Sequence, residues 1–315
     1  GNWRISEKAF HNARKLAADD LKFEAGYDEY GRSAQWAEDD LRQWEDDKRP
    51  ALTLNQIGQF TNQVVNEGRQ QRPAIRVYPA GGGADPLTAK ALQGVIRSIE
   101  QNSHASVAYE TGYEHMVKCG FGYWLIRTKH TYDNPKNAEE FDAQHLEVKR
   151  VRNPFTVFPD PSGEEIDGSD WGFCVLSEDM LRDVYVRKYG ESNLANLDVW
   201  QAEGNLPAGW LDGESCRVAE YYYAKDKKEK AFLLSNGAVV LKSELDGSFK
   251  KYGNNGLLPG VKVARDRDVV IRSIHWAKIN AVEVLEETVV PGIYIPVVPV
   301  YGSELVIDGK YILYG

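Results

Sequence analysis

The chain has 315 residues, 42% of them hydrophobic, which is enough to fold around one large core or two smaller ones. Its formal net charge of −9 argues against a protein that binds nucleic acid over its whole surface. The charge is compatible with a local basic face, or with an acidic surface that repels passing DNA and so does not bind it. No stretch approaches the roughly 20 apolar residues that span a bilayer, and residues 1–20 contain no apolar signal-peptide core. We therefore expect a soluble protein made in a cytoplasm, whose three dispersed cysteines form neither disulfides nor a zinc site.

Residues 1–50 are rich in charged and aromatic side chains. Few β-branched residues occur in 5–25 and 34–47, so both ranges are predicted to be helices. Successive helical residues point in different directions and do not converge on one ion, so neighbouring acids here are predicted to be solvated, with no metal and no cofactor. These acids occur in three pairs: Asp19 with Asp20, Asp39 with Asp40, and Asp46 with Asp47.

A third helix is predicted over residues 53–68, where apolar side chains recur at helical spacing. Thr53 or Asn55 is able to cap its start. Gly68 is expected to loosen the helix near its end, and Pro73 forbids its continuation. The helix is therefore expected to end shortly after Gly68.

Two more helices are predicted after a strand at residues 74–80. The first has Asp85 as its N-cap, followed by proline at the first helical position. The second covers residues 103–119 and ends at Gly120. One stripe of this second helix holds Ala108, Gly112, His115 and Cys119, so the histidine is predicted to be packed and hydrogen-bonded rather than catalytic or metal-binding.

From residue 120 onward the pattern changes to alternating and β-branched runs separated by Gly, Asn and Pro, which predicts strands. These runs cover residues 120–130, 145–151, 155–160, 171–177, 216–225, 230–242, 269–280 and 281–292. Residues 177–190 interrupt them as a predicted amphipathic helix that begins at Ser177. Helices followed by a mostly antiparallel sheet region make an α+β fold. We expect a helical arm at 1–50, a helical core at 51–130 and a β-rich region at 131–315.

No enzyme motif occurs in its proper context. The glycines at 81–83 and at 120 and 122 do not lie between a strand and a helix as a nucleotide-binding loop requires. A metal-dependent, DNA-processing nuclease stays open as an alternative because one stretch is rich in carboxylates, although its prolines indicate a turn. These carboxylates are Asp160, Glu164, Glu165, Asp167 and Asp170.

Two aromatic patterns are also relevant to binding. Residues 221–232, YYYAKDKKEKAF, mix aromatic side chains with lysines, as do sites that stack bases and neutralise phosphates. The favoured interpretation is a strand that enters a hairpin turn, with Asp226, Lys227 and Lys228 solvated at its tip. Aromatic faces also suit sugar rings, so a β-rich carbohydrate-binding virion protein is a second alternative. Surface clustering of four tryptophans would favour it: Trp171, Trp200, Trp210 and Trp276.

Four blocks of the sequence resemble a known family. They are RPALTLNQIGQFTNQVVNEGRQQRPAIRVYP, AYETGYEHMVKCGFGYWLIRT, NPFTVFPDPSG and IPVVPVYGSELVIDGKY. In their order and spacing, these blocks resemble the portal proteins of short-tailed double-stranded DNA phages. The resemblance runs from about residue 49 to the end, whereas the residues before it match only loosely.

The resemblance implies a structural, non-enzymatic subunit of a ring, typically a dodecamer, at one vertex of an icosahedral capsid. Such rings form the channel through which an ATP-driven terminase packages DNA, and they later anchor the tail through which the DNA leaves. The implied partners are other copies of the chain, the major capsid protein, scaffolding protein, terminase, a tail adaptor protein and the passing double-stranded DNA, with no membrane. The implied location is the virion, at the portal vertex, with assembly in the host cytoplasm.

In this family, the segment that matches IPVVPVYGSELVIDGKY leads into a long channel-lining stem helix, then the clip and the crown. Here the sequence stops at Gly315. We therefore expect this chain to be the wing part of a portal subunit, without stem, clip and crown.

An arginine group at the end of the third predicted helix has three interpretations. The preferred one, which depends on the resemblance, is intersubunit ion pairs of Arg69, Arg72 and Arg76 with an acidic neighbour. Helix termination alone is second, because basic residues suit the negative end of the helix dipole. Contact with DNA is third. The candidate acidic partners are Asp39, Asp40, Asp46 and Asp47, and replacing Arg69 and Arg72 by Glu is expected to impair ring assembly.

Overall fold

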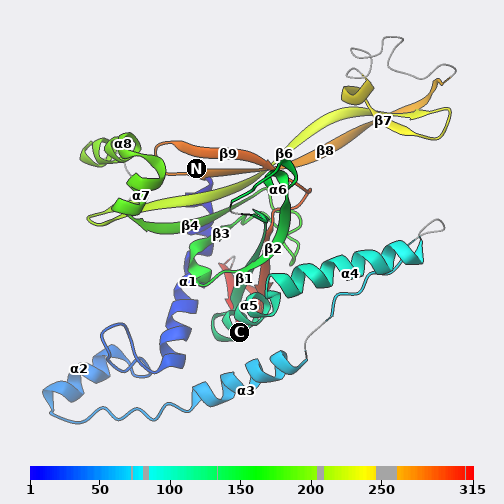
Figure 1. Ribbon diagram of the computed structural model, residues 1–315. Coiled ribbons are helices and arrows are strands. Elements are labelled where there is room, and N and C mark those ends of the chain that lie inside the picture. Colours follow the sequence, from blue (N-terminus) through cyan, green and yellow to red (C-terminus); the bar gives the residue numbers. More distant parts are fainter. Residues whose placement is uncertain (72–73, 81–84, 133, 204–208, 246–260, 309) are drawn as a thin grey trace. The chain divides into compact units, whose positions relative to one another are not determined.

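The computed structural model describes residues 1–71, 74–80, 85–132, 134–203, 209–245, 261–308 and 310–315 (Figure 1). The chain forms two compact units, one made of Gly1–Glu178 with Ile295–Gly315 and the other of Asp179–Tyr294. Helices dominate the first part of the sequence and antiparallel strands the rest, which confirms the predicted α+β class. Among the described helices, none is both long enough and apolar enough to cross a membrane.

The helices of the first unit are α1 (Asn2–Ala25), α2 (Glu38–Asp46), α3 (Ile57–Gln70), α4 (Pro86–Asn102), α5 (Ala105–Cys119), α6 (Ala138–Asp142) and the short 3-10 helix η1 (Pro154–Thr156). Its strands are β1 (Phe121–His130), β2 (Gln144–Arg150), β3 (Val157–Pro159), β10 (Val297–Tyr301), β11 (Ser303–Ile307), β12 (Lys310–Tyr314) and the start of β4 (Phe173–Leu181). The predicted helices in residues 1–119 are therefore confirmed, with shifted ends.

Local start and stop signals were read correctly at two of these helices. The Asp85 side chain accepts hydrogen bonds from the backbone N–H groups of Leu87 and Thr88 at the start of α4. Gly120 ends α5 in the left-handed conformation, with φ 83°. Such caps depend only on neighbouring residues, so the sequence alone reveals them.

The core of the first unit lies where α5 packs on β1, the middle strand of the antiparallel sheet β10-β1-β2. A Cβ atom at Gly122 would lie 2.0 Å from the carbonyl oxygen of Gly112, so backbone meets backbone at this contact. On the same side, Tyr109 of α5 packs edge-on against Trp124 of β1, with ring centroids 5.0 Å apart. Gly122 thus allows α5 and β1 to pack at close range, whereas Gly120 lies against the backbone of Leu313 and Tyr314 in β12.

Helix α1 is joined to the turn that precedes β3. Its Arg14 side chain donates a hydrogen bond to the carbonyl oxygen of Val157 (3.0 Å) and another to that of Phe155. The guanidinium also lies 4.3 Å from the centroid of the Phe158 ring, and the ring of Trp3 lies tilted against that of Phe158 with the centroids 3.7 Å apart. Burial lowers the pKa of Arg14, so this charge is held where carbonyl oxygens and rings replace water.

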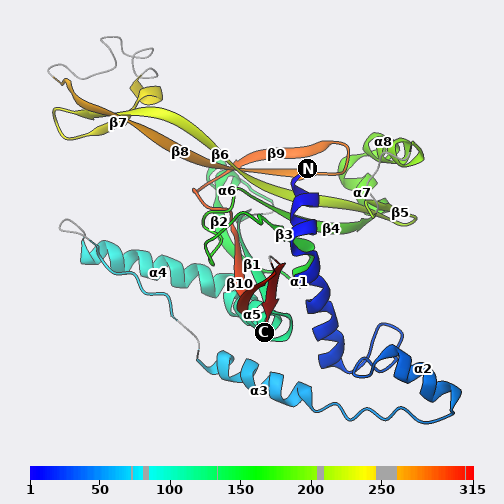
Figure 2. The same cartoon turned by 180° about the vertical axis from the view of Figure 1, so that it is seen from behind.

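The last strands of the chain return to the first unit. Strands β11 and β12 form a hairpin that contacts both α1 and α5 (Figure 2). The backbone N–H of Gly302 donates to the carbonyl oxygen of Gly120 at 2.9 Å. The end of α5 is therefore fixed by a segment from the far end of the sequence.

The second unit is built on long antiparallel strands. It contains the end of β4, then α7 (Arg182–Tyr189), α8 (Glu191–Ala202), β5 (Leu211–Asp212), β6 (Ser215–Leu234), β7 (Val239–Leu241), β8 (Val263–Ile279) and β9 (Val284–Val290). A small core forms where α7 and α8 cover one end of β6: Tyr185, Leu197, Leu211, Cys216 and Val218. The hydroxyl of Tyr185 in this core accepts a hydrogen bond from the side chain of Asn280 at 2.8 Å.

Strands β6 and β8 continue past β9 as a ribbon, which β7 joins by pairing with β6 at Ala231–Leu233 (Figure 1). They pair in register from Ala219↔Ile279 to Leu233↔Arg265, whereas β9 pairs only with Ile274–Ile279 of β8. The predicted hairpin tip at Asp226, Lys227 and Lys228 is therefore wrong. These residues are exposed, but they lie in mid-strand, because lysines tolerate a solvated ribbon as well as a turn.

Two other local predictions are wrong. Residues 74–80 form no strand, although the segment is β-branched and aromatic. Residues 177–181 continue β4 instead of starting a helix, and α7 begins only at Arg182. Both errors have one cause: a strand needs a partner, and the presence of that partner is set by the fold rather than by the segment itself.

Candidate intersubunit interface

Arg69, the first of the predicted interface residues, has partners within its own chain. Its guanidinium lies 3.2 Å from a carboxylate oxygen of Glu114 and 3.5 Å from one of Glu110, both on α5. Lys118 continues the network, with its ammonium 3.0 Å from Glu114 and 3.5 Å from Glu24 of α1. Burial alone would lower the pKa of Lys118, but its two carboxylate partners outweigh burial and raise it. This network ties α3 to α5 and α1.

Gly68 determines how closely α3 approaches α5. A Cβ atom at Gly68 would lie 2.2 Å from Cε1 of the Tyr113 ring. Gly68 lies inside α3, which runs on to Gln70, so its role here is to admit a ring rather than to end the helix. The helix ends two residues later, as expected, while the loosening at Gly68 stays a prediction and Pro73 lies outside the described residues.

The N-cap residue of α3 is Gln56, which makes no side-chain cap hydrogen bond, so neither predicted cap, Thr53 or Asn55, holds that position. Asn55, one residue earlier, still fixes the start of α3. Its side-chain oxygen accepts from the backbone N–H of Ile57 (3.2 Å), and its amide group donates to the carbonyl oxygen of Glu24 (2.7 Å). Thr53, the other candidate, instead bonds Ser33 through the two hydroxyls at 2.6 Å. The first residues of α3 are therefore attached to the end of α1.

The remaining predicted interface residues lie on the surface. Arg76 is exposed in the irregular segment 74–80, and Arg72 lies outside the described residues. Asp39, Asp40, Asp46 and Asp47 are all exposed on or directly after α2, which has no buried residue. Asp47 lies 3.7 Å from Arg49 within the chain. The structure thus places acidic and basic side chains where another molecule can reach them.

The stretch from the end of α2 to α4 also exposes large apolar side chains. Leu54 is 86% exposed, Leu52 77%, Leu87 74% and Tyr78 72%. The helices of this stretch bury little: Val65 is the buried residue of α3 and Ala89 that of α4. Apolar exposure on this scale is typical of protein surfaces that another chain covers.

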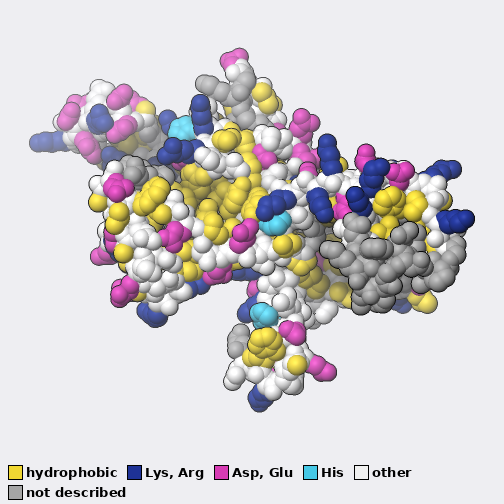
Figure 3. All heavy atoms as spheres, turned by 90° about the horizontal axis from the view of Figure 1, so that it is seen from above, with side chains coloured by type: hydrophobic (Ala, Val, Ile, Leu, Met, Phe, Trp, Pro, Cys, Tyr) yellow, Lys and Arg dark blue, Asp and Glu magenta, His cyan; other side chains and the backbone are white. Residues whose placement is uncertain are grey.

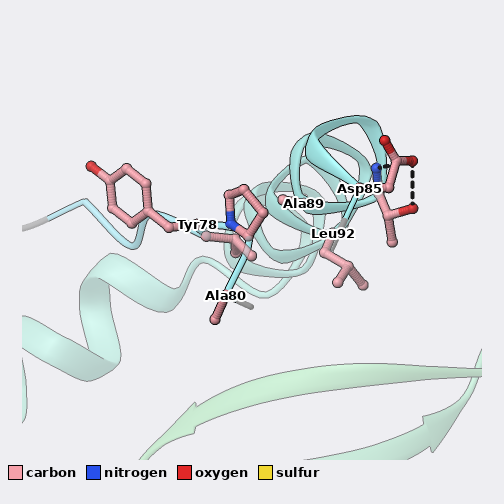
Figure 4. Close-up of a pocket in the computed structure, with 8 residues that line it drawn as sticks. Tyr78, Ala80, Asp85, Ala89 and Leu92 are labelled. Carbon is pink, nitrogen blue, oxygen red and sulfur yellow. Dashed lines mark hydrogen bonds between the residues drawn. The ribbon is translucent and has the colours of Figure 1, made fainter. Parts of the chain in front are cut away.

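A shallow hollow of about 420 Å³ lies between the segment 74–80 and α4 (Figure 4). Tyr78 and Ala80 border it on one side, and Ala89 and Leu92 of α4 on the other. Asp85 at its rim is occupied by the helix cap, so its carboxylate is not free for a ligand. The hollow suits an apolar side chain of a partner better than a polar small molecule.

The carboxylates of the alternative nuclease site organise their own loop. Asp160 accepts hydrogen bonds from the backbone N–H groups of Ser162 (2.9 Å) and Gly172 (2.8 Å). Asp170 accepts one from the backbone N–H of Glu165 at 3.2 Å. Across the parts of the chain that the structure describes, no group of three His, Cys, Asp or Glu side chains is arranged to hold a metal ion.

The tryptophans of the carbohydrate-binding alternative do not gather on the surface. Trp171 and Trp210 are buried, Trp276 is partly buried, and Trp200 is exposed on α8. A sugar-stacking surface needs exposed ring faces, so this distribution counts against that alternative.

His115 of α5 is packed, as predicted, and burial lowers its pKa. Its Nδ1 atom has no hydrogen-bond partner among the described residues, which corrects the expected hydrogen bond.

Sequence reasoning missed several residues that position these helices. The Glu114 and Lys118 pair is readable from its four-residue spacing, with the acid first. The contacts of Arg69 with Glu110 and of Gly68 with Tyr113 join separate helices, so no local signal marks them. Arg14 likewise gave no signal, because its partners are backbone carbonyls of another segment.

The comparison with known proteins concerns the whole chain. A family model described as phage P22-like portal protein matches residues 1–315. A relative named portal protein, from Acyrthosiphon pisum secondary endosymbiont phage 1, is 23% identical over 269 residues, which cover 83% of this chain and 36% of the relative. The matched part is therefore little more than a third of that relative's length. On the match over its full length, this chain belongs to the phage P22-like portal protein family.

Proposed function

We propose that this chain is a structural, non-enzymatic part of a portal ring at one vertex of a phage capsid. In this role it forms part of the conduit for DNA packaging and ejection and of the head–tail junction. The observation that carries the proposal is the family match over residues 1–315. The exposed apolar and charged stretch from α2 to α4 supports it, because a ring subunit must offer surfaces to its neighbours.

A ring needs two different surfaces on each subunit, because each copy contacts the next one head to tail. We assign one surface to the acidic side chains of α2 and the other to Arg76 in the segment 74–80. Both are exposed and of opposite charge. Arg69 is a weaker candidate than it was from sequence alone, since its guanidinium already pairs with two glutamates of its own chain.

The remaining partners follow from the same proposal. They are the major capsid protein, scaffolding protein, terminase, a tail adaptor protein and the double-stranded DNA that passes through the ring. The proposed copy number is twelve, typical of such rings, and the proposed location is the virion, with assembly in the host cytoplasm. No cofactor takes part in this function.

Disulfide trapping between differently marked chains tests the assigned contact. One chain carries Asp39→Cys and another carries Arg76→Cys, and the two are mixed under oxidising conditions. The native thiols are poor competitors, because Cys119, Cys174 and Cys216 are buried and burial raises the pKa of each. We expect covalent dimers in the mixture and far fewer with either chain alone.

A matched control uses Glu139→Cys, another exposed acid, on α6. A mixture of this variant with Arg76→Cys is expected to give few dimers. Equal trapping with Asp39→Cys and Glu139→Cys would show random collision and refute the assigned contact. Rings that form without any Asp39–Arg76 trapping would refute it as well, while leaving the portal function itself intact.

A further inference from the structure

Leu54, in the segment 48–56 between α2 and α3, is the most exposed large apolar side chain among the described residues, at 86%. Both of its neighbours in the chain are held by hydrogen bonds. The hydroxyl of Thr53 bonds that of Ser33 at 2.6 Å and accepts from Nε1 of Trp36 at 3.2 Å. Asn55 donates to the end of α1 at 2.7 Å. A side chain on a fixed backbone loses less freedom on binding, so Leu54 is preorganised for contact with another surface.

The apolar hollow between the segment 74–80 and α4 follows the other end of α3 (Figures 1 and 4). Tyr78 on one side of this hollow is 72% exposed, and Leu92 on the other is 52% exposed. Helix α3 has 14 residues and is therefore about 21 Å long, with Leu54 before its start and the hollow after its end. Each copy thus presents an exposed leucine at one end of α3 and an apolar hollow past the other.

The surfaces around Leu54 and around the hollow carry opposite charges. Residues 38–49 hold six exposed acids against three exposed cations: Glu38, Asp39, Asp40, Glu45, Asp46 and Asp47 against Arg42, Lys48 and Arg49. Residues 74–80 and 85–97 hold three exposed cations against one acid: Arg76, Lys90 and Arg97 against Asp85. On the face drawn in Figure 3, by contrast, basic and acidic side chains lie interspersed. Complementary charges of this kind orient two surfaces toward each other and suppress wrong partners.

A second copy of this chain fits both surfaces at once. The exposed leucine and the hollow differ in shape, and the side chains around them differ in sign of charge. Two such surfaces on one chain match each other between copies, which is the arrangement of a head-to-tail contact. An unrelated partner would require neither surface to be complementary to the other.

We propose that Leu54 of one copy inserts into the hollow between the segment 74–80 and α4 of the next copy. The inference rests on the proposed portal function and adds an apolar contact to the charge contact between α2 and Arg76. Removal of apolar surface from water supplies stability, whereas the charges supply orientation. Leu52, which is 77% exposed beside Trp36 and Trp44, extends the apolar surface next to Leu54.

A chain with two new cysteines, Leu54→Cys and Leu92→Cys, tests the contact and its geometry. Oxidation is expected to give covalent dimers, trimers and larger species on a non-reducing gel, because a head-to-tail contact uses a different cysteine on each side of a copy. The matched control carries Leu54→Cys with Leu146→Cys, since Leu146 is another exposed leucine, on β2, away from the lining of the hollow. This control is expected to give few covalent species.

The contribution of the leucine itself is measured in the trapping of Asp39→Cys with Arg76→Cys. Leu54→Gln in the Asp39→Cys chain is expected to lower the yield of covalent dimers at least about tenfold, because the apolar surface is no longer removed from water. Leu146→Gln in the same chain is expected to leave the yield unchanged. Leu54 is 86% exposed, so its replacement leaves the fold of a single chain intact, which equal unfolding temperatures verify.

Several outcomes would overturn this inference. The first is an absence of covalent species, or as many from the control with Leu146→Cys. The second is a product that stops at dimers, because it would mean a two-fold contact and would count against a ring as well. The third is an unchanged yield of rings from a longer portal protein that carries Leu54→Gln, which would leave the portal function standing. A failure of the unaltered longer protein to form rings would count against the portal function itself.

Discussion

Single residues fix the approach of α3 to α5, and Gly68 shows how. From the sequence, a glycine near the end of a helix indicates a weak end. In the fold it faces the Tyr113 ring, which lies on another helix. The sequence gives the position of Gly68, but it does not show that the Tyr113 ring lies against it. That contact exists only in the folded chain, where α3 packs on α5.

Gly68→Ala is expected to destabilise the first unit. Its new Cβ would lie 2.2 Å from Tyr113 Cε1, and overpacking of this kind costs about 1–3 kcal/mol, against about 1 kcal/mol gained in helix propensity. We predict a net loss of up to about 2 kcal/mol in the free energy of unfolding, measured by denaturant unfolding. Gly94→Ala in α4 is the matched control, because no atom lies within 4 Å of its Cβ position. It is expected to be neutral or stabilising, and an equal loss in both variants would contradict this role of Gly68.

At the scale of elements, local cap signals were predicted better than the presence or absence of a strand partner, and helices α6 and α8 were not predicted. The cap at Asp85 and the end at Gly120 are local and were predicted correctly. Residues 74–80 were predicted as a strand and are irregular, while 177–181 were predicted as helix and are strand. Pairing partners decide these cases, and periodicity within a segment carries no information about partners.

The ion pairs of Arg69 are expected to hold α3 in place. Arg69→Glu replaces two attractions with repulsion from Glu110 and Glu114. Partly exposed pairs are worth up to about 1 kcal/mol each, so we predict a loss of about 1–2 kcal/mol in the free energy of unfolding. Arg42→Glu is the control, since Arg42 pairs with Glu38 at 2.8 Å on the exposed helix α2. Its expected loss is below about 0.5 kcal/mol.

This prediction also bears on assembly. A failure of Arg69→Glu to form rings would report a displaced α3 as readily as a lost intersubunit contact. Equal unfolding free energies for Arg69→Glu and the unaltered chain would contradict the anchoring role. They would also return Arg69 to the list of candidate contacts between subunits.

For the whole molecule, the sequence was most informative through its resemblance to portal proteins, which the match over residues 1–315 confirms. Composition and motifs excluded classes of protein but identified none. The division into an arm at 1–50, a core at 51–130 and a β-rich region stays a prediction, since packing groups the chain as 1–178 with 295–315 and as 179–294. A grouping that joins both ends of a sequence depends on long-range contacts such as that of β12 with α1.

The most direct test of the central claim is the mass and symmetry of the assembled particle, by mass photometry and negative-stain microscopy. It is made on a longer portal protein that contains these residues, because this chain corresponds to 36% of its relative. We predict a ring with rotational symmetry and a central hole, formed alone or when capsid and scaffolding proteins are supplied. A protein that stays monomeric with both partners present, or that closes into a two-fold dimer without a hole, would contradict the portal function.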